Sequence, residues 1–149
     1  MTDLSGAIWH NDKPEYGFQL TETGYSESGR PIYEYQSDAV HPMTLQTSEA
    51  CFVRPDRHGF TDLGSVPWFA RRVIPVALHP ASFILHDSPC RVGERHVLYC
   101  ASQIEGPYRE CSISYGSAAK LLGKGLAAAG FPKRARIAYH FVKRYGPKW

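Results

Sequence analysis

The strongest limit on the fold of this chain is a helical periodicity near its C-terminus. From Ser117, apolar residues recur at the three- and four-residue spacing of one helix face, until Gly130 and Pro132 end the pattern. A second helix is predicted over residues 133–145. Its apolar face is predicted to consist of Ile137, Ala138, Phe141, Val142 and Tyr145. Because the link is short, the two helices are expected to form an antiparallel hairpin over residues 116–146.

The first part of the chain carries the short aromatic and β-branched runs that are typical of strands. Strands are predicted at residues 16–20, 31–35, 50–53 and 60–63. Residues 26–30 and 55–59 contain glycine, proline or small polar residues that favour turns, so the first two strands are expected to form a hairpin. Residues 1–14 hold one strong apolar anchor, Trp9, and are interpreted as an N-terminal arm.

Between these strands and the closing helices, the pattern predicts two short helices and a hairpin. Ser65 is expected to cap a helix that ends before Pro75, and a second helix is predicted from Pro80 toward Pro89. The fold class is therefore α+β, with N-terminal antiparallel strands packed on three or four helices. The expected parts of a single domain, 1–149, are an arm (1–14), a mainly β part (15–63), a helical part (64–90), an inserted hairpin (91–115) and the helix hairpin (116–146).

The composition agrees with one domain that has its own core. The chain has 149 residues, of which 43% are hydrophobic and 21% are charged. No run approaches the roughly 18 apolar residues of a membrane span, and the first residues lack the basic and apolar regions of a signal peptide. We therefore expect a protein that has no membrane span and is cytoplasmic at synthesis.

Charge is distributed unevenly along the chain. Residues 1–110 contain all 14 acidic residues and nine basic ones, whereas residues 111–149 contain eight basic residues and no acidic one. The basic end is either a solvated helix face or a surface for nucleic acid, an anionic surface or an acidic protein. No nucleic-acid-binding fold frames it, so nucleic acid is not the expected partner. The candidate interaction residues are Arg134, Arg136, Lys143, Arg144 and Trp149, and Tyr139 and Tyr145 are further candidates for stacking.

The four cysteines, Cys51, Cys90, Cys100 and Cys111, lack the paired spacing of a zinc site. Free buried thiols are the default expectation for a cytoplasmic protein. The alternative is one bridge among the last three cysteines, which lie close together in the sequence. Phosphate-binding loops, nucleophile elbows and zinc-protease motifs are also absent from the sequence.

The most chemically suggestive pair is His86-Asp87, which lies near the end of a predicted buried helix. A histidine in such a place is a core residue bonded to backbone, a catalytic proton carrier or a metal ligand. Asp87 either satisfies backbone donors at the helix end, pairs with Arg71 or Arg72, or acts with the histidine. Asp62 is either a turn acceptor or a metal ligand. The candidate catalytic residues are therefore His86 and Asp87, and the candidate metal ligands are Asp62 and Asp87.

The order Phe60-Thr61-Asp62-x-x-Ser65-Val66-Pro67, then Leu85-His86-Asp87, then an Ala-rich helix and an Arg/Tyr-rich helix resembles a known family. This is the phage and prophage family called domain of unknown function 1353, and the resemblance covers roughly residues 50–146. The chain departs from the family pattern after His86-Asp87, where Ser88-Pro89-Cys90 replaces an aromatic-rich segment. It also has Ala118-Ala119 where the family has Ala-Asp.

The His-Asp helix is also similar to that of secreted phospholipases A2, in which the histidine is the general base. The neighbouring Asp binds calcium in those enzymes, and a distant Asp orients the histidine. The resemblance implies calcium at Asp87 and Asp62, and it would place the orienting carboxylate at Ala119 unless another acid, such as Asp62, takes its place.

Two functions are expected from these observations. The first is a structural or accessory component of a phage or prophage virion, such as its tail or neck. Its partners would be other virion proteins or further copies of the chain, and it would need no cofactor. Such a protein would be made in the host cytoplasm and carried in the virion. The alternative is a hydrolase of lipid or cell-envelope esters, and calcium belongs to this alternative alone.

Overall fold

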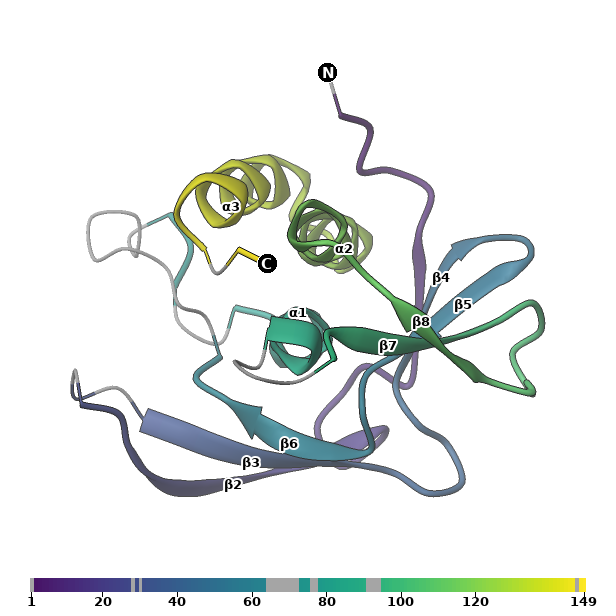
Figure 1. Ribbon diagram of the computed structural model, residues 1–149, viewed down its shortest axis with the longest axis horizontal. Helices are drawn as coiled ribbons and strands as arrows, with labels where there is room; N and C mark the ends of the chain where they lie inside the picture. Colours follow the sequence, from purple (N-terminus) through teal and green to yellow (C-terminus); the bar gives the residue numbers. More distant parts are fainter. Residues whose placement is uncertain are drawn as a thin grey trace.

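The computed structural model describes residues 2–27, 29, 31–63, 73–75, 78–90, 95–146 and 148–149. These residues have an α+β fold, with eight antiparallel strands in two sheets and three α-helices (Figure 1). The predicted fold class is confirmed at this level. The helix predicted from Ser65, and the pairing of Asp87 with Arg71 or Arg72, fall largely or wholly outside the described residues.

One sheet has five strands in the order β1-β4-β5-β7-β8. These strands are β1 (Ile8–His10), β4 (Thr44–Ser48), β5 (Cys51–Arg54), β7 (Val97–Ala101) and β8 (Arg109–Ser112). β1 lies inside the expected arm and pairs with β4, which the sequence pattern did not predict. β7 and β8 pair with each other as expected, but β7 also pairs with β5, so this hairpin continues the sheet.

The second sheet has three strands, β2 (Phe18–Tyr25), β3 (Pro31–Ser37) and β6 (His58–Thr61), in the order β2-β3-β6. The predicted β2–β3 hairpin is confirmed, although β2 begins and ends later than expected. β6 begins inside the predicted turn at 55–59, because His58 and Gly59 pair with Gln36 and Tyr35 of β3. The strand therefore depends on a partner that is distant in the sequence.

The helices are α1 (Pro80–Asp87), α2 (Tyr115–Ala128) and α3 (Pro132–Tyr145), and a short 3-10 turn, η2 (Ser88–Cys90), follows α1. The Ser114 hydroxyl accepts a hydrogen bond from Ser117 N at 3.2 Å and caps α2. Gly130, with φ of +99°, adopts the left-handed conformation that ends a helix. None of the helices in the described parts of the chain combines the length and apolar character that crossing a membrane requires.

α1 lies at the centre of the molecule, with the three-stranded sheet on one side and α2 and α3 on the other (Figure 1). Its residues enter all three apolar clusters of the core. Phe83 packs with residues of α2 and α3, Ile84 packs with Phe18 and Tyr35, and Leu85 packs with Leu98. A helix that is surrounded in this way has few places where a polar side chain reaches water, so its polar groups need partners within the protein.

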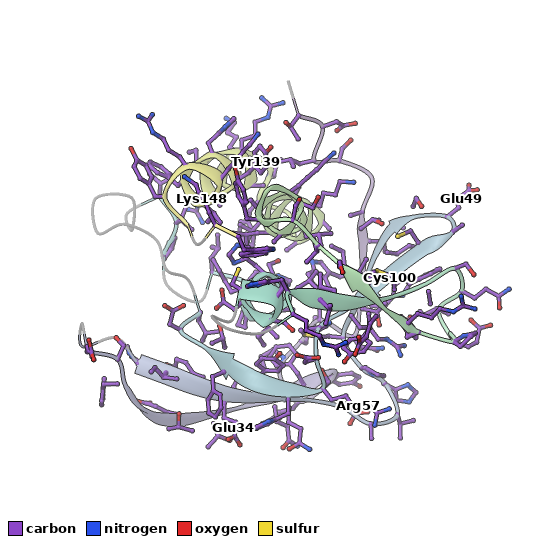
Figure 2. The ribbon with its side chains drawn as sticks, viewed as in Figure 1. Glu34, Glu49, Arg57, Cys100, Tyr139 and Lys148 are labelled. Carbon is purple, nitrogen blue, oxygen red and sulfur yellow. A yellow bond between two sulfur atoms is a disulfide. The ribbon has the colours of Figure 1, made fainter. Side chains whose placement is uncertain are left out.

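The predicted apolar face of α3 is confirmed except at its end. Ala138 is buried, and Ile137, Phe141 and Val142 are partly buried against the core, whereas Tyr145 has 57% of its surface exposed. The fully buried residues of the helix also include Ala135 and Tyr139. Tyr139 lies where α3 meets α2, close to Gly123, and is 5% exposed (Figure 2). The expectation that Tyr139 is available for stacking was therefore wrong, because close contact between α2 and α3 covers its ring.

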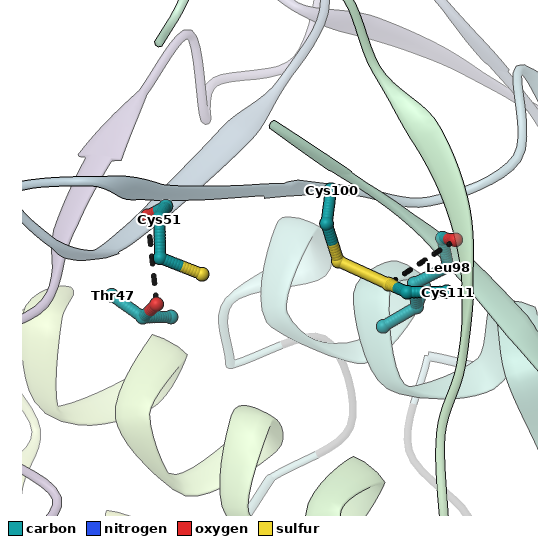
Figure 3. The surroundings of a disulfide bond; sticks show 5 residues. All are labelled: Thr47, Cys51, Leu98, Cys100 and Cys111. Atoms are coloured by element: carbon teal, nitrogen blue, oxygen red, sulfur yellow. Dashed lines mark hydrogen bonds between the residues drawn. A yellow bond between two sulfur atoms is a disulfide. The ribbon is translucent and has the colours of Figure 1, made fainter. Parts of the chain in front are cut away.

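One disulfide joins Cys100 of β7 to Cys111 of β8 (Figure 3). Cys51 and Cys90 are free. Leu98 is the register partner of Cys111, and Cys100 lies two residues further along β7. The two sulfurs therefore leave neighbouring strands on the same face of the sheet. The default expectation of four free thiols is wrong for this pair, and the alternative of one bridge is confirmed.

Candidate functional site

His86 occupies the last turn of α1 and is 7% exposed. Its ring Nδ1 lies 3.1 Å from Oδ1 of Asp87. Because the helix is packed on all sides, a ring without such a partner would be a costly buried polar group. The two residues that the sequence singled out are therefore in direct contact.

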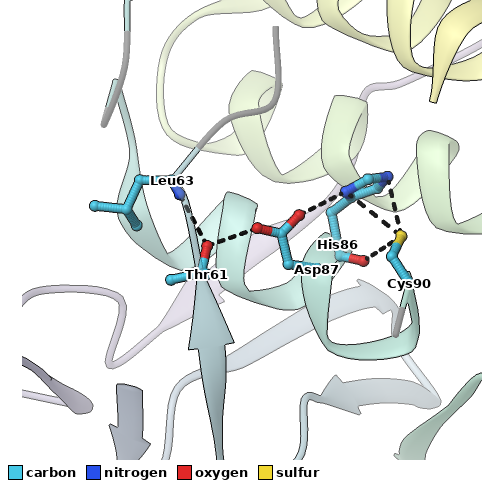
Figure 4. A network of polar contacts seen from close by, with 5 residues as sticks. All are labelled: Thr61, Leu63, His86, Asp87 and Cys90. Atoms are coloured by element: carbon cyan, nitrogen blue, oxygen red, sulfur yellow. Dashed lines mark hydrogen bonds and ion pairs between the residues drawn. The ribbon is translucent and has the colours of Figure 1, made fainter. Parts of the chain in front are cut away.

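Asp87 is held from a second direction by β6. Its other oxygen, Oδ2, accepts a hydrogen bond of 2.6 Å from the Thr61 hydroxyl, which in turn accepts one of 3.0 Å from Leu63 N (Figure 4). Both carboxylate oxygens therefore have partners, one from its own helix and one from a strand. Thr61 was not among the predicted site residues, although it stands beside Asp62 in the sequence motif.

Cys90, in η2, is the third member of this group. Its sulfur lies 3.6 Å from Nε2 and 3.8 Å from Nδ1 of His86, and it donates to the His86 carbonyl oxygen at 3.1 Å. These similar distances to the two nitrogens place the sulfur beside the ring rather than in line with one nitrogen. Cys90 was not among the predicted site residues. The sequence feature that could have indicated it is its position four residues after His86, because η2 brings the two side chains close together.

The surroundings of His86 decide its protonation state. Burial is the largest single influence on its pKa and lowers it, but the hydrogen bonds to Asp87 and Cys90, with the charges of both groups, raise the pKa from 6.5 to about 10. The ring is therefore an imidazolium near pH 7. An imidazolium donates a proton but has no lone pair to deprotonate water, so the resting state does not fit the general-base role that the phospholipase resemblance implies.

The contacts of His86 lie on the wall of a cavity of about 330 Å³. Asp62, His86, Asp87 and Cys90 all line it, so the structure brings together every catalytic and metal candidate from the sequence. The rest of its wall is mainly apolar and comes from β3, β6, α1, α2 and α3. The apolar lining residues are Ile32, Phe60, Phe83, Leu122, Ala138 and Val142. The size and character of this cavity suit the apolar part of a small ligand.

The residue at position 119, where the resemblance would place the carboxylate that orients His86, is an alanine that lies in the apolar core. Ala119 is fully buried in the apolar cluster with Phe83 and Leu122, so it offers no polar group to the ring. The carboxylate beside Nδ1 belongs instead to Asp87, the neighbour of His86 in the chain. One residue therefore takes the place that the phospholipase resemblance gave to a distant acid.

The metal prediction concerns Asp62 and Asp87. Within the described residues, no three side chains of His, Cys, Asp or Glu gather in a way that would hold a metal ion. Calcium prefers six to eight oxygen ligands, and both oxygens of Asp87 already accept hydrogen bonds or ion-pair contacts from the protein. Calcium binding stays a prediction.

The predicted interaction residues are arranged in two ways. Arg136, Lys143 and Arg144 are exposed on α3, and Arg134 is half-buried against the Phe131 ring, 5.7 Å from its centre. Trp149 packs back onto the protein. Its ring stacks on His96 with a centroid distance of 4.3 Å, and its Nε1 donates to the Ile113 carbonyl at 2.8 Å. Three of the four basic groups are therefore exposed to solvent, whereas Trp149 packs against the protein.

Comparison of the chain with protein families, curated proteins and solved structures found no match. The resemblance to the phage and prophage family therefore stays a prediction from its motifs, and the site is interpreted from its own geometry.

Proposed function

We propose that this protein is a hydrolase that cleaves esters of a lipid or cell-envelope compound in the cavity beside His86. The observation that carries the proposal is the contact of 3.1 Å between His86 Nδ1 and Asp87 Oδ1 on the cavity wall. A carboxylate at one ring nitrogen fixes the orientation of a histidine and stabilises its protonated form.

The charge state of His86 assigns it a role in this reaction. An imidazolium is placed to donate a proton to the alkoxide that leaves when an ester is cleaved, and the raised pKa keeps it protonated near pH 7. The apolar wall contributed by Phe83, Leu122 and Val142 would hold the acyl part of the substrate. The expected substrates are therefore esters that have an apolar acyl group.

The test is hydrolysis of mixed phospholipid micelles and of chromogenic carboxylic esters, with added calcium and with a chelator. The variant is His86→Gln, and the matched control is His58→Gln, a histidine whose side chain is 55% exposed. We expect turnover by the wild type and the control and a loss of about 100-fold or more in His86→Gln. Equal turnover by folded His86→Gln would refute the proposal. The chelator decides whether calcium takes part.

A second function, a structural or accessory component of a phage or prophage virion, is favoured by the exposed surface. Phe60 of β6 and Tyr25 of β2 are 51% and 68% exposed, so the three-stranded sheet presents apolar groups to solvent. On the other side of α1, the basic residues of α3 are exposed, and we propose that α2 and α3 form the antiparallel hairpin that carries them. Apolar and basic surfaces of this kind suit contacts with neighbouring subunits.

This second proposal is tested by sedimentation of the purified protein over a range of salt concentrations, and by its incorporation into phage particles. Concentration-dependent association that weakens at high salt would support contacts through the basic residues of α3. A monomer at every salt concentration that never joins particles would exclude this function.

A further inference from the structure

We propose that Cys90 is the nucleophile of this site and carries the acyl group of the substrate as a thioester. The inference rests on the proposed hydrolase function and adds to it the residue that attacks the ester. It is carried by the position of the Cys90 sulfur, which lies on the wall of the same cavity and within 3.6 Å of His86 Nε2.

The Cys90 sulfur lies near both ring nitrogens of His86, at 3.6 Å from Nε2 and 3.8 Å from Nδ1. Asp87 contacts Nδ1 at 3.1 Å, so Nε2 is the nitrogen that has the sulfur without the carboxylate. Nucleophilic cysteines act as thiolates, and a neighbouring imidazolium is a common counter-ion for them. The order Cys90, His86, Asp87 therefore supplies a nucleophile, a proton carrier and a carboxylate that orients the carrier.

The other free cysteine, Cys51, provides an internal comparison for the surroundings of the Cys90 thiol. Cys51 lies in β5, is also partly buried, and packs beside the apolar cluster of Leu45, Val53 and Leu98. Within the described part of the chain its sulfur has no imidazole partner, and it is not among the residues that line the cavity. The two thiols thus have similar burial but different chemical surroundings.

The first half of the reaction starts from the ion pair in which Cys90 is a thiolate and its proton is held by the His86 imidazolium. The Cys90 thiolate then attacks the ester carbonyl carbon, and a carbon–sulfur bond forms. The carbon–oxygen bond to the alcohol breaks, and the departing oxygen takes a proton from the His86 imidazolium. The products are a free alcohol, an acyl thioester on Cys90 and a neutral His86.

In the second half, neutral His86 accepts a proton from water, and the resulting hydroxide attacks the thioester. The carbon–sulfur bond breaks, the carboxylic acid leaves, and the thiolate and imidazolium are restored. One ester and one water give one acid and one alcohol, so no other reactant is needed. The general-base role of His86 then belongs to this half of the cycle, in which the ring is neutral.

The first experiment measures the alkylation rates of Cys90 and Cys51 by iodoacetamide at pH 7 under non-reducing conditions, with peptide mass spectrometry. We expect Cys90 to react about tenfold or more faster than Cys51 in the wild type. The advantage should disappear in His86→Gln and decrease in Asp87→Asn. The Cys51 rate shows whether each variant is folded, because unfolding would expose both thiols.

The second experiment measures ester turnover in Cys90→Ser and Cys51→Ser. We expect Cys90→Ser to lose about 100-fold or more of the turnover, Cys51→Ser to retain it, and acid quenching of the wild type to trap an acyl adduct on Cys90. Full turnover in Cys90→Ser would overturn this inference and leave the hydrolase function standing. If no ester is hydrolysed, the hydrolase proposal fails. If the two cysteines are also alkylated at equal rates, the assignment of Cys90 as a nucleophile is overturned as well. If Cys90 is alkylated faster than Cys51 and this difference depends on His86, the assignment of Cys90 as a nucleophile is still supported.

Discussion

α1 carries a histidine beside a carboxylate at each of its ends. At the N-terminal end, His79 Nε2 lies 2.9 Å from Asp12 Oδ2, and its Nδ1 lies 2.7 Å from the Ser82 hydroxyl. At the C-terminal end, His86 contacts Asp87 and the Cys90 sulfur. Both sets have the residue types of a hydrolytic triad, and the first has the more familiar composition of Ser, His and Asp.

Access separates the two ends. Ser82 is fully buried beneath α2, where a Cβ added to Gly125 would lie 2.7 Å from its hydroxyl oxygen. The Gly125 carbonyl accepts a hydrogen bond of 2.8 Å from Trp9 Nε1, which closes the same place from the other side. In the part of the chain that the structure describes, these neighbours leave no space for a substrate carbonyl at the Ser82 hydroxyl, whereas His86 and Cys90 line a cavity. A set of residues of the triad type can therefore act as a catalytic site only where the fold leaves space for a substrate next to it.

The largest expected effect is the loss of ester turnover when the carboxylate at the His86 end is removed, compared with removal of the carboxylate at the His79 end. Asp87→Asn keeps an oxygen for the Thr61 hydroxyl but removes the charge beside His86, so we expect ester turnover to decrease about 100-fold. Asp12→Asn should leave turnover within about threefold of the wild type, because His79 meets no substrate. Turnover is measured on variants whose circular dichroism matches the wild type. Equal losses would show that both ends serve the reaction.

At the His86 end of α1, pH is expected to change the stability of the fold. The folded pKa of His86 is about 10, above its ordinary value of 6.5, so its stabilisation is complete below about pH 6.5 and is lost as pH rises toward 10. Between pH 7 and pH 9 we expect the free energy of unfolding to decrease by about 2 kcal/mol through this group.

Denaturant unfolding at several pH values measures this decrease. His86→Gln should have a flatter pH dependence, and His58→Gln, which removes an exposed side-chain contact with Glu34, should keep the wild-type slope. An unchanged slope in His86→Gln would mean that the ring is neutral in the folded protein. The role of His86 as an acid would then be excluded.

Some of the helices and site residues in this comparison could be predicted from the sequence. The helical periodicity predicted α2 and α3 to within two residues at each boundary, and the apolar run after Pro80 predicted α1. The pair His86-Asp87 was found because both residues are adjacent in the chain. Local patterns of this kind depend on few distant contacts, which is why they can be interpreted without a structure.

The missed features depend on distant partners. β1 exists because Trp9 pairs with Leu45, 36 residues later in the chain, and a three-residue strand has no period of its own. Thr61 joins the site because β6 passes beside the end of α1, and Cys90 joins it because η2 turns it back toward His86. The set at His79 was also hidden, since Asp12 lies 67 residues away in the sequence.

A smaller effect is expected where α2 covers the His79 end. A Cβ at Gly125 would lie 2.7 Å from Ser82 Oγ and 3.0 Å from the Trp9 ring, and Ser82 is held by its bond to His79. Gly125→Ala should therefore lower the free energy of unfolding by about 1 to 2 kcal/mol, despite its better helix propensity. Gly116→Ala, in the same helix but with open space, should be neutral or stabilising. Equal stability of the two variants would show that α2 leaves room above Ser82.

The smallest effect is expected from Ser82→Ala, which decides whether the hydroxyl at the buried end acts only as a structural partner. The change removes the 2.7 Å hydrogen bond to His79 Nδ1, so thermal unfolding should report a loss of about 1 kcal/mol, compared with no change in the exposed Ser48→Ala. Ester turnover should stay at the wild-type level, because the hydroxyl is closed off by Gly125 and Trp9. A 100-fold decrease in turnover would instead make Ser82 the nucleophile. It would require α2 to move away from α1 during the reaction, and it would transfer the catalytic role from the His86 end to the His79 end of the same helix.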